Sequence, residues 1–223
     1  GPSMKTAKPG VPGAVGKTYA AMPEQPEYGT SHISIVDGFG NAIAMTTTIE
    51  DQFGSRLMTD GGTGKAGGFL LNNELTDFSF APSDAEGKPV ANRVQPGKRP
   101  RSSMAPTLVF DKATGQLVMS GGSPGGALII HFTAKTLYGV LNWGLMPQQA
   151  IDLPNFASLN GPTLLEEKRF APATVEALRA RGAEVREQPM TSGLQAITRG
   201  QAHGMTLWLG GADPRREGLV MGE

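Results

Sequence analysis

The sequence predicts an α+β fold with a largely antiparallel sheet. Short segments with β-branched residues occur in pairs joined by Gly, Asn and Asp, which is the pattern of antiparallel hairpins. Helical periodicity is confined to the middle of the chain, after the first strands and before the last ones. A parallel α/β protein would instead alternate strands and helices along its length.

The first hairpin is predicted over residues 31–48. Residues 31–36 alternate polar and apolar, with Ile33 and Ile35 on one face, as a half-buried strand does. Asp37-Gly38-Phe39-Gly40-Asn41 is a turn cluster, and residues 42–48 form a strand with β-branched residues. A Gly-rich loop then covers 54–68, and a short apolar strand covers 69–71.

The rest of the chain supplies a long loop, a second hairpin, three helices and two closing strands. Residues 79–98 are polar with Pro and Gly, a surface loop long enough to suggest function. After residue 126, an i, i+4, i+7, i+11 recurrence predicts a helix whose buried stripe is Ile130, Ala134, Leu137 and Leu141. The other predicted elements are a hairpin at 107–110 and 117–120, helices at 147–153 and 172–181, and strands near 194–199 and 204–209.

Composition excludes several classes of function. Lys+Arg and Asp+Glu both number 20, so no net field recruits nucleic acid or an anionic membrane. Cysteine is absent, and the three His residues, at 32, 131 and 203, lack zinc-site spacing, so neither a metal nor a cofactor is expected. These histidines are interpreted as structural. No apolar run reaches the roughly 18 residues that a membrane span needs.

Residues 1–29 read as a tail that precedes the domain at 30–223. They hold five prolines and several glycines and show no apolar periodicity. The opening Gly1-Pro2-Ser3-Met4 is typical of a tag-cleavage scar joined to an internal start. Any natural targeting segment would therefore lie upstream of this sequence.

The glycine-rich segment 121–126 lies between a predicted strand and a predicted helix, where phosphate-binding loops occur. It lacks the Lys-Ser/Thr of a P-loop and does not fit G-x-G-x-x-G. Consecutive glycines at a helix start expose backbone N–H groups, which suit an oxyanion as well as a phosphate. Taken alone, the segment is equally explained as a tight turn.

In chain order, several segments form one pattern. They are Gly29-Thr30-Ser31-His32, then Thr48 and Phe53-Gly54-Ser55, the run from Leu70 to Phe78, the run from Lys98 to Thr107, Gly122-Ser123-Pro124-Gly125-Gly126, and Ala212-Asp213-Pro214-Arg215. This pattern resembles the small subunit of γ-glutamyltransferases, which belong to the N-terminal nucleophile hydrolase superfamily. The resemblance extends from about residue 30 to the end of the chain.

The resemblance implies a four-layer αββα sandwich built from a large and a small subunit that are cut from one precursor. Self-cleavage between Gly29 and Thr30 would make Thr30 the first residue of the small subunit and its nucleophile. The freed α-amine, with a pKa of about 7.7–8.0, suits the role of its base. The glycine before Thr30 limits steric bulk around the carbonyl that is attacked. Residues 1–29 would then include the end of the large subunit, and the location would be periplasmic or extracellular.

The resemblance also assigns roles within the site. It implies that Thr48 orients the nucleophile and that a lid lies at 79–98. It further implies oxyanion donors at Gly125 and Gly126, α-carboxylate ligands at Ser102 and Ser103, and α-ammonium ligands at Glu74 and Asp77. Two carboxylates facing one ammonium are sound electrostatics, because a desolvated cation needs paired charge.

The activity implied is acyl transfer from γ-glutamyl donors, such as glutathione, to water or an amino acid. Glu50 departs from the family pattern, because it stands where an Asn is expected to contact the donor's α-carboxylate. An acid there should repel that carboxylate, which leaves the related cephalosporin (glutaryl) acylases as an alternative. A second alternative is an uncleaved, inactive fragment, since the large subunit is not part of this sequence.

Overall fold

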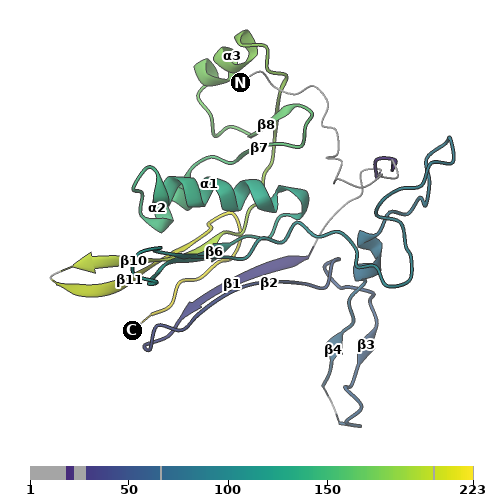
Figure 1. Cartoon of the computed structure of the whole chain (residues 1–223), viewed down its shortest axis with the longest axis horizontal. Helices are drawn as coiled ribbons and strands as arrows, with labels where there is room; N and C mark the ends of the chain where they lie inside the picture. The colour runs from purple at the N-terminus through teal and green to yellow at the C-terminus, as the bar shows by residue number, and fades with distance from the viewer. Residues whose placement is uncertain (1–18, 23–28, 66, 203, 223) are drawn as a thin grey trace. The chain divides into compact units, whose positions relative to one another are not determined.

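The computed structural model describes residues 19–22, 29–65, 67–202 and 204–222 (Figure 1). The predicted tail at residues 1–29 lies almost wholly outside this description, so its boundary stays a prediction. The chain divides into two compact units. Among the described residues, unit 1 comprises those within 31–47 and from Ser103 onward, and unit 2 comprises residues 19–22 and 29–30 and those within 48–102. Each unit is described by itself.

Unit 1 is organised around a four-stranded sheet in the order β11-β10-β6-β5, in which every neighbouring pair is antiparallel. Its strands are β5 (Thr107–Phe110), β6 (Leu117–Gly122), β10 (Gln195–Ala202) and β11 (Met205–Ala212). Helices α1 (Ile129–Leu141) and α2 (Pro147–Asp152) cover one face of this sheet (Figure 1). The core between them includes Met119, Phe132, Ile151, Leu194 and Ala196. The predicted antiparallel α+β fold is confirmed.

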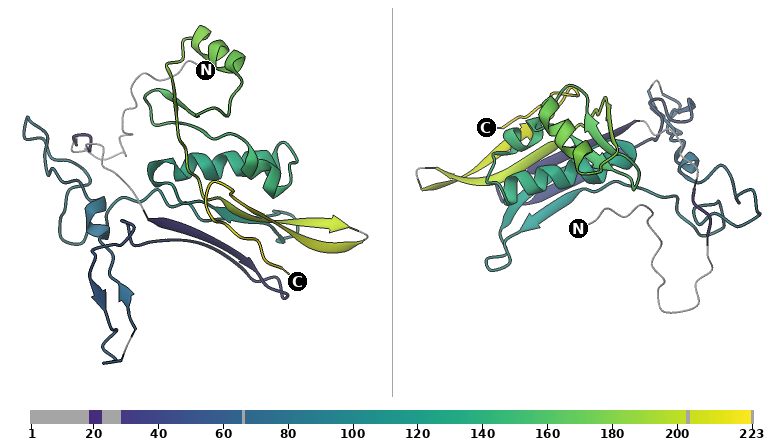
Figure 2. Two further views of the ribbon diagram at one scale, coloured as in Figure 1. Left: turned by 180° about the vertical axis from the view of Figure 1, so that it is seen from behind. Right: turned by 90° about the horizontal axis from the view of Figure 1, so that it is seen from above.

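The predicted first hairpin is also confirmed, as β1 (Thr30–Val36) and β2 (Ala42–Thr48). Its turn is closed by the Asp37 carboxylate, which accepts hydrogen bonds from the backbone N–H groups of Phe39 and Asn41. The part of the hairpin that belongs to unit 1 lies along the sheet face opposite α1 and α2, as Figure 2 shows from behind. The Ser120 hydroxyl of β6 donates to the Ile43 carbonyl oxygen at 2.9 Å. Unit 1 therefore stacks helices, a sheet and a second, two-stranded layer.

The hairpin buries the opposite face from the one that hydrophobicity suggests. Alternation along β1 is as predicted, but His32 is the buried residue, while Ile33 and Ile35 are 40% and 49% exposed. Ile43 and Met45 of β2 are exposed in the same way. An apolar strand face left open to water costs free energy, so this face marks a contact surface.

The predicted buried stripe of helix α1 is wrong. Ile130 and Leu141 are about half exposed, whereas the helix buries the face that carries Phe132, Thr133, Lys135 and Thr136. Hydrophobicity alone missed this face because two of its buried side chains are polar groups with hydrogen-bond partners. The Thr136 hydroxyl donates to the Phe132 carbonyl oxygen at 3.1 Å. The Lys135 ammonium donates to the carbonyl oxygens of Ile151 (3.1 Å) and Leu153 (2.8 Å), at the end of α2.

A small three-stranded sheet, which sequence reasoning did not predict, follows α2 in the chain. It has the order β7-β8-β9, with β7 (Phe156–Ser158) antiparallel and β9 (Val185–Gln188) parallel to β8 (Thr163–Glu166). Strands of three or four residues carry too little periodicity to be recognised. Helix α3 (Pro172–Ala180) contacts β9 and ends before Gly182, whose φ of +86° suits glycine, as predicted.

The motif Asp213-Pro214-Arg215 joins this small sheet to the end of α2. The Arg215 guanidinium donates to both Glu166 carboxylate oxygens, at 2.6 and 2.8 Å, and to Asp213 Oδ1 at 3.1 Å. It also donates to the carbonyl oxygens of Ile151 and Leu153. All of these groups are largely buried, so each charge depends on its partners.

Unit 2 contains little regular structure. Its elements are β3 (Met58–Thr59), β4 (Phe69–Leu70) and the 3₁₀ helix η1 (Glu74–Asp77). The segment 54–68 was predicted as loop throughout, but Met58 pairs with Leu70 and Thr59 with Phe69. Residues 79–98 form neither helix nor strand beyond isolated bridges, as predicted. Among the described residues of the whole chain, no helix is long and apolar enough to cross a membrane.

Candidate active site

Three groups of unit 2 meet at the Gly29–Thr30 peptide bond. The Thr30 hydroxyl, at the first residue of β1, donates to Thr48 Oγ1 at 3.2 Å. The Thr48 hydroxyl lies 3.5 Å from the Gly29 carbonyl oxygen as a donor, and it accepts from the Glu50 backbone N–H at 2.8 Å. The last residue of β2 therefore contacts both the hydroxyl that is predicted to attack and the carbonyl that would be attacked.

Gly29 is required at this bond for a reason that sequence alone did not reveal. Its φ is +84°, a conformation that side chains other than glycine rarely adopt. A Cβ at this position would come within 2.6 Å of the Glu50 carbonyl oxygen and 2.8 Å of the Asp51 carbonyl group. The backbone of residues 50–51 thus leaves space for a glycine only.

Glu50, Glu74 and Asp77 form one acidic cluster. Glu50 is buried with a φ of +73°, and its carboxylate accepts a hydrogen bond from the side-chain amide of Asn73, the residue that precedes η1. Glu74 and Asp77 are the first and last residues of η1. Burial, a hydrogen bond to Asp77 and then the charges of Asp77 and Glu50 raise the pKa of Glu74 to about 7. The structure therefore groups Glu50 with the two acids that the resemblance assigns to the ammonium.

Asn92, in the loop at 79–98, ties this acidic segment to the serine pair. Its side-chain amide donates to the Asp77 carbonyl oxygen at 2.7 Å and accepts from the Arg101 backbone N–H at 3.2 Å. Ser102 follows directly and is exposed, and Ser103, which is half-buried, begins the second stretch of unit 1. Sequence reasoning singled out the loop but not Asn92, because no pattern distinguishes it from other loop asparagines.

The predicted oxyanion donors lie in unit 1, at the junction between β6 and α1. Gly125 has a φ of +142°, and a Cβ there would meet the Phe132 ring at 2.5 Å. Gly126 has a φ of +56° and begins a 3₁₀ turn (Gly126–Leu128) that leads into α1. Within the part of the chain that the structure describes, neither glycine N–H donates a hydrogen bond. Two free donors at a helix start can bind developing negative charge.

The predicted site residues are thus found as two groups. Thr30, Thr48, Glu50, Glu74, Asp77 and Ser102 belong to unit 2, and Ser103, Gly125 and Gly126 to unit 1. Among the described residues, no group of three His, Asp or Glu side chains is arranged to hold a metal ion. Two residues near these groups were not predicted to act there: Asn73, which holds Glu50, and His32, which was interpreted as structural. The only signal for either was its place within a motif.

Comparison with known proteins identifies the family of the chain. The family model described as Gamma-glutamyltranspeptidase matches residues 3–223. The glutathione hydrolase proenzyme of Pseudomonas sp. (strain A14) is 34% identical over 96% of this chain, and that of Escherichia coli (strain K12) is 35% identical over 83%. These alignments cover 36% and 31% of the two relatives, so the chain spans about a third of their length.

Solved structures give the same result. An acivicin-inhibited γ-glutamyltranspeptidase superposes with a TM-score of 0.71 at 30% identity, covering 83% of this chain and 98% of that one. The γ-glutamyltranspeptidase of Pseudomonas nitroreducens complexed with L-DON superposes with a TM-score of 0.68 at 29% identity, covering 86% and 98%. A cephalosporin acylase from Bacillus halodurans, at 24% identity and a TM-score of 0.68, shares the fold. The chain belongs to the γ-glutamyltranspeptidase family of N-terminal nucleophile hydrolases.

Proposed function

We propose that this chain is the nucleophile-bearing part of a self-cleaving γ-glutamyltransferase or glutathione hydrolase. The observation that carries the proposal is the contact between Thr30, Thr48 and the Gly29 carbonyl. Family membership supports it, because the relatives named above are glutathione hydrolase proenzymes. No cofactor takes part in this proposal.

Self-cleavage follows from the geometry at Gly29. Thr30 Oγ1 attacks the Gly29 carbonyl carbon, the bond to the Thr30 nitrogen breaks, and that nitrogen takes up a proton and leaves as the amine. Water then hydrolyses the resulting ester, which frees the Gly29 carboxylate and the Thr30 hydroxyl. The Thr48 hydroxyl stabilises the negative charge on the carbonyl oxygen during the attack.

Acyl transfer uses the same hydroxyl with a new base. The Thr30 α-amine accepts the hydroxyl proton and passes it to the leaving amine of the donor, since α-amines titrate close to neutral pH. The N–H groups of Gly125 and Gly126 hold the oxyanion. Ser102 and Ser103 bind the donor's α-carboxylate, and the acidic cluster binds its α-ammonium. Water or an amino acid then attacks the γ-glutamyl-Thr30 ester.

The partner is the large subunit of the same precursor, and residues 1–29 include its last residues. The open apolar face of the β1–β2 hairpin supports this, because Ile33, Ile35, Ile43 and Met45 need a cover. The chain's span of only a third of its relatives agrees with a missing larger part. The location proposed for the assembled protein is the periplasm or the extracellular space, from the family resemblance.

The first test replaces the hydroxyl while keeping the backbone. Full-length precursor is expressed as wild type, Thr30→Ala and Thr30→Ser, and intact mass reports cleavage at Gly29–Thr30. We expect no cleavage and no hydrolysis of γ-glutamyl anilide for Thr30→Ala, and slower but measurable cleavage for Thr30→Ser. Cleavage and turnover by Thr30→Ala would contradict the proposal.

The donor class is the finer part of the proposal. Glu50 lies with Glu74 and Asp77, so its charge favours a donor that carries an ammonium, as a γ-glutamyl group does and a glutaryl group does not. Repulsion between Glu50 and the donor's α-carboxylate would instead disfavour γ-glutamyl donors. Glu50→Gln keeps an oxygen that can accept from Asn73 and removes only the charge.

We therefore expect Glu50→Gln to lower kcat/KM for γ-glutamyl anilide by roughly tenfold and to leave glutaryl anilide unchanged. The matched control is Glu86→Gln, an exposed charge in the loop at 79–98. If Glu50→Gln instead raises the γ-glutamyl rate, repulsion dominates and a glutaryl acylase becomes the better reading.

A further inference from the structure

His32 lies two residues after the proposed nucleophile, and it is almost wholly buried in unit 1, with 7% of its surface exposed. Its ring nitrogens are both engaged, Nδ1 with Thr46 Oγ1 at 2.8 Å and Nε2 with Ser34 Oγ at 3.1 Å. Burial lowers the pKa of His32 to about 4. The imidazole is therefore neutral at physiological pH and uses one N–H donor and one lone pair on two hydroxyls.

The face of the His32 ring packs against Gly122, the last residue of β6. A Cβ at Gly122 would lie 2.5 Å from His32 Cε1, 2.6 Å from Nδ1 and 3.0 Å from Nε2. Real Cβ atoms do not approach other atoms so closely, so the ring occupies the space that any other residue at 122 would need. Gly122 pairs with Gln195 of β10, so its own position is set by the sheet.

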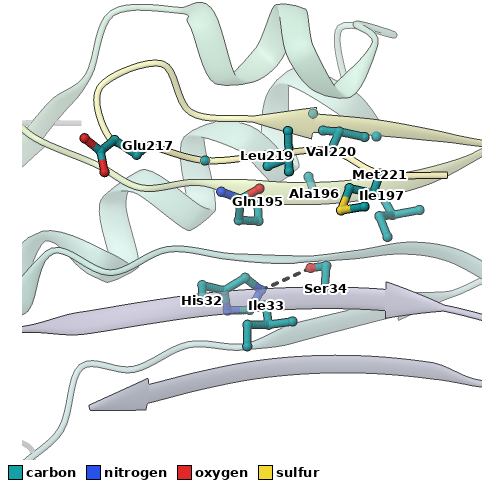
Figure 3. Close-up of a pocket in the computed structure, with 13 residues that line it drawn as sticks. His32, Ile33, Ser34, Gln195, Ala196, Ile197, Glu217, Leu219, Val220 and Met221 are labelled. Atoms are coloured by element: carbon teal, nitrogen blue, oxygen red, sulfur yellow. Dashed lines mark hydrogen bonds between the residues drawn. The ribbon is translucent and has the colours of Figure 1, made fainter. Parts of the chain in front are cut away.

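Figure 3 shows a cavity beside the ring. His32 and Ser34 line a cavity of about 260 Å³, and the facing residues include Gln195 and Ile197 of β10 and Val220 near the end of the chain. The ring thus borders open space as well as Gly122. The ring therefore keeps its place through Thr46, Ser34 and the surface of Gly122.

We propose that His32 is a positioning residue that sets the separation between β1 and the end of β6 within unit 1, and with it the position of the oxyanion loop at Gly125 and Gly126, which follows β6. The inference rests on the proposed function, because it takes Thr30 and these glycines as the reacting groups. An oxyanion site must keep its position to within a fraction of an ångström, so a spacer that sets the end of the strand leading into it acts on the rate of the chemical step. The ring itself transfers no proton.

The experiment is a double-mutant cycle in the full-length precursor with four members: wild type, His32→Ala, Gly122→Ala and the double variant. The readouts are the cleaved fraction by intact mass, then kcat and KM for γ-glutamyl anilide in the cleaved fraction, and the thermal unfolding midpoint. Gly122→Ala is expected to lower kcat by roughly ten- to a hundredfold with KM within about twofold, since it pushes the ring away. In the His32→Ala background the added methyl enters vacated space, so the same substitution should cost less than about threefold.

Gly121→Ala is the matched control, because a Cβ there would meet Met119, Gln195 and Ala196 instead of His32. Its effect should be the same with and without His32→Ala. Equal costs of Gly122→Ala in both backgrounds, or a fall in the unfolding midpoint with kcat unchanged, would overturn the inference. Cleavage and turnover by Thr30→Ala would instead overturn the proposed function.

His32→Gln keeps a polar side chain and covers the case in which the alanine variants do not fold. We expect kcat to fall while both limbs of the kcat/KM profile between pH 5 and 9 stay where they are in the wild type. Disappearance of a limb near pH 6.5 would show that His32 titrates in the reaction, which contradicts a neutral spacer.

Discussion

At the scale of single residues, two glycines of the site have no room for a side chain. Gly29 faces the carbonyl groups of residues 50 and 51, and Gly125 faces the Phe132 ring. Both have positive φ values, so each is held by conformation as well as by space. Substitutions at such positions test the site without removing any chemical group from it.

Gly29→Ala should slow self-cleavage strongly while Thr30 and Thr48 remain. The added Cβ has to displace the backbone at Glu50, whose N–H is bonded to Thr48, so the approach of hydroxyl to carbonyl is lost. We expect cleavage to slow by about a hundredfold, as for other misplacements near 1 Å. Intact mass against time measures this. Gly38→Ala, in the hairpin turn with open space around it, is the control that should cleave normally.

The acidic cluster predicts a pH dependence of donor binding. Glu74, with a pKa of about 7 against an ordinary 4.5, is protonated below neutrality in the free protein. An ammonium favours the ionised form, so KM for γ-glutamyl anilide should fall as pH rises through about 7. Glu50→Gln removes one negative neighbour and should move this inflection to lower pH. An inflection that does not move would show that Glu50 and Glu74 do not interact.

The Glu74 carboxyl also makes the stability of the fold depend on pH, with the opposite sign to donor binding. The folded state holds a proton on Glu74 between pH 4.5 and about 7 that the unfolded chain has released. Stability from this group is therefore greatest below pH 4.5 and declines as pH rises through that window. A rise in pH therefore strengthens donor binding at Glu74 and lowers the free energy of unfolding that this group contributes.

At the scale of elements, the end of α2 is held by two cations with different roles. Arg215 joins Glu166 of β8, Asp213 and two carbonyl groups of α2, whereas Lys135 of α1 donates to the same two carbonyls. Burial, with a further contribution from the Arg215 charge, lowers the pKa of Lys135 to about 8. Removing Lys135 leaves the carbonyls satisfied, but removing Arg215 leaves buried carboxylates without a partner.

Arg215→Met should therefore lower the free energy of unfolding by about 3–5 kcal/mol, the usual cost of breaking a buried pair from one side. Lys135→Met, of similar volume, should change it by less than about 1 kcal/mol. Urea unfolding of the assembled protein at pH 7 measures both. Similar losses for the two variants would contradict the division of roles.

At the scale of the whole molecule, the outward face of the β1–β2 hairpin is apolar and open. A single charge placed there should prevent assembly with the preceding part of the precursor, because it would be buried without a partner. We expect Ile35→Asp to abolish co-purification of the two parts from cells that express them separately. Ala173→Asp, an exposed position in the first turn of α3 where a negative charge is tolerated, should assemble as the wild type does.

Local signals in the sequence were sufficient for the elements and for the family. Alternation predicted the first hairpin, and the turn segment at 111–115 predicted the second. Pro172 and Gly182 bounded α3, and the ordered motifs indicated the family that the comparisons confirm. The roles of the individual site residues stay predictions until the substitutions above are made. The strands β7, β8 and β9 were missed because three or four residues are too few for a period to show.

The tertiary structure alone decided which faces are buried and which groups meet. Hydrophobicity favoured the Ile33 face of β1 and the Ile130 stripe of α1, yet the chain buries His32 and Lys135. Polar groups can be buried wherever partners distant in sequence satisfy them, and Thr46 for His32 and the α2 carbonyls for Lys135 do so here. The fit of Gly29 against residues 50–51 and of His32 against Gly122 likewise depends on atoms 20 to 90 residues apart, which no local pattern records.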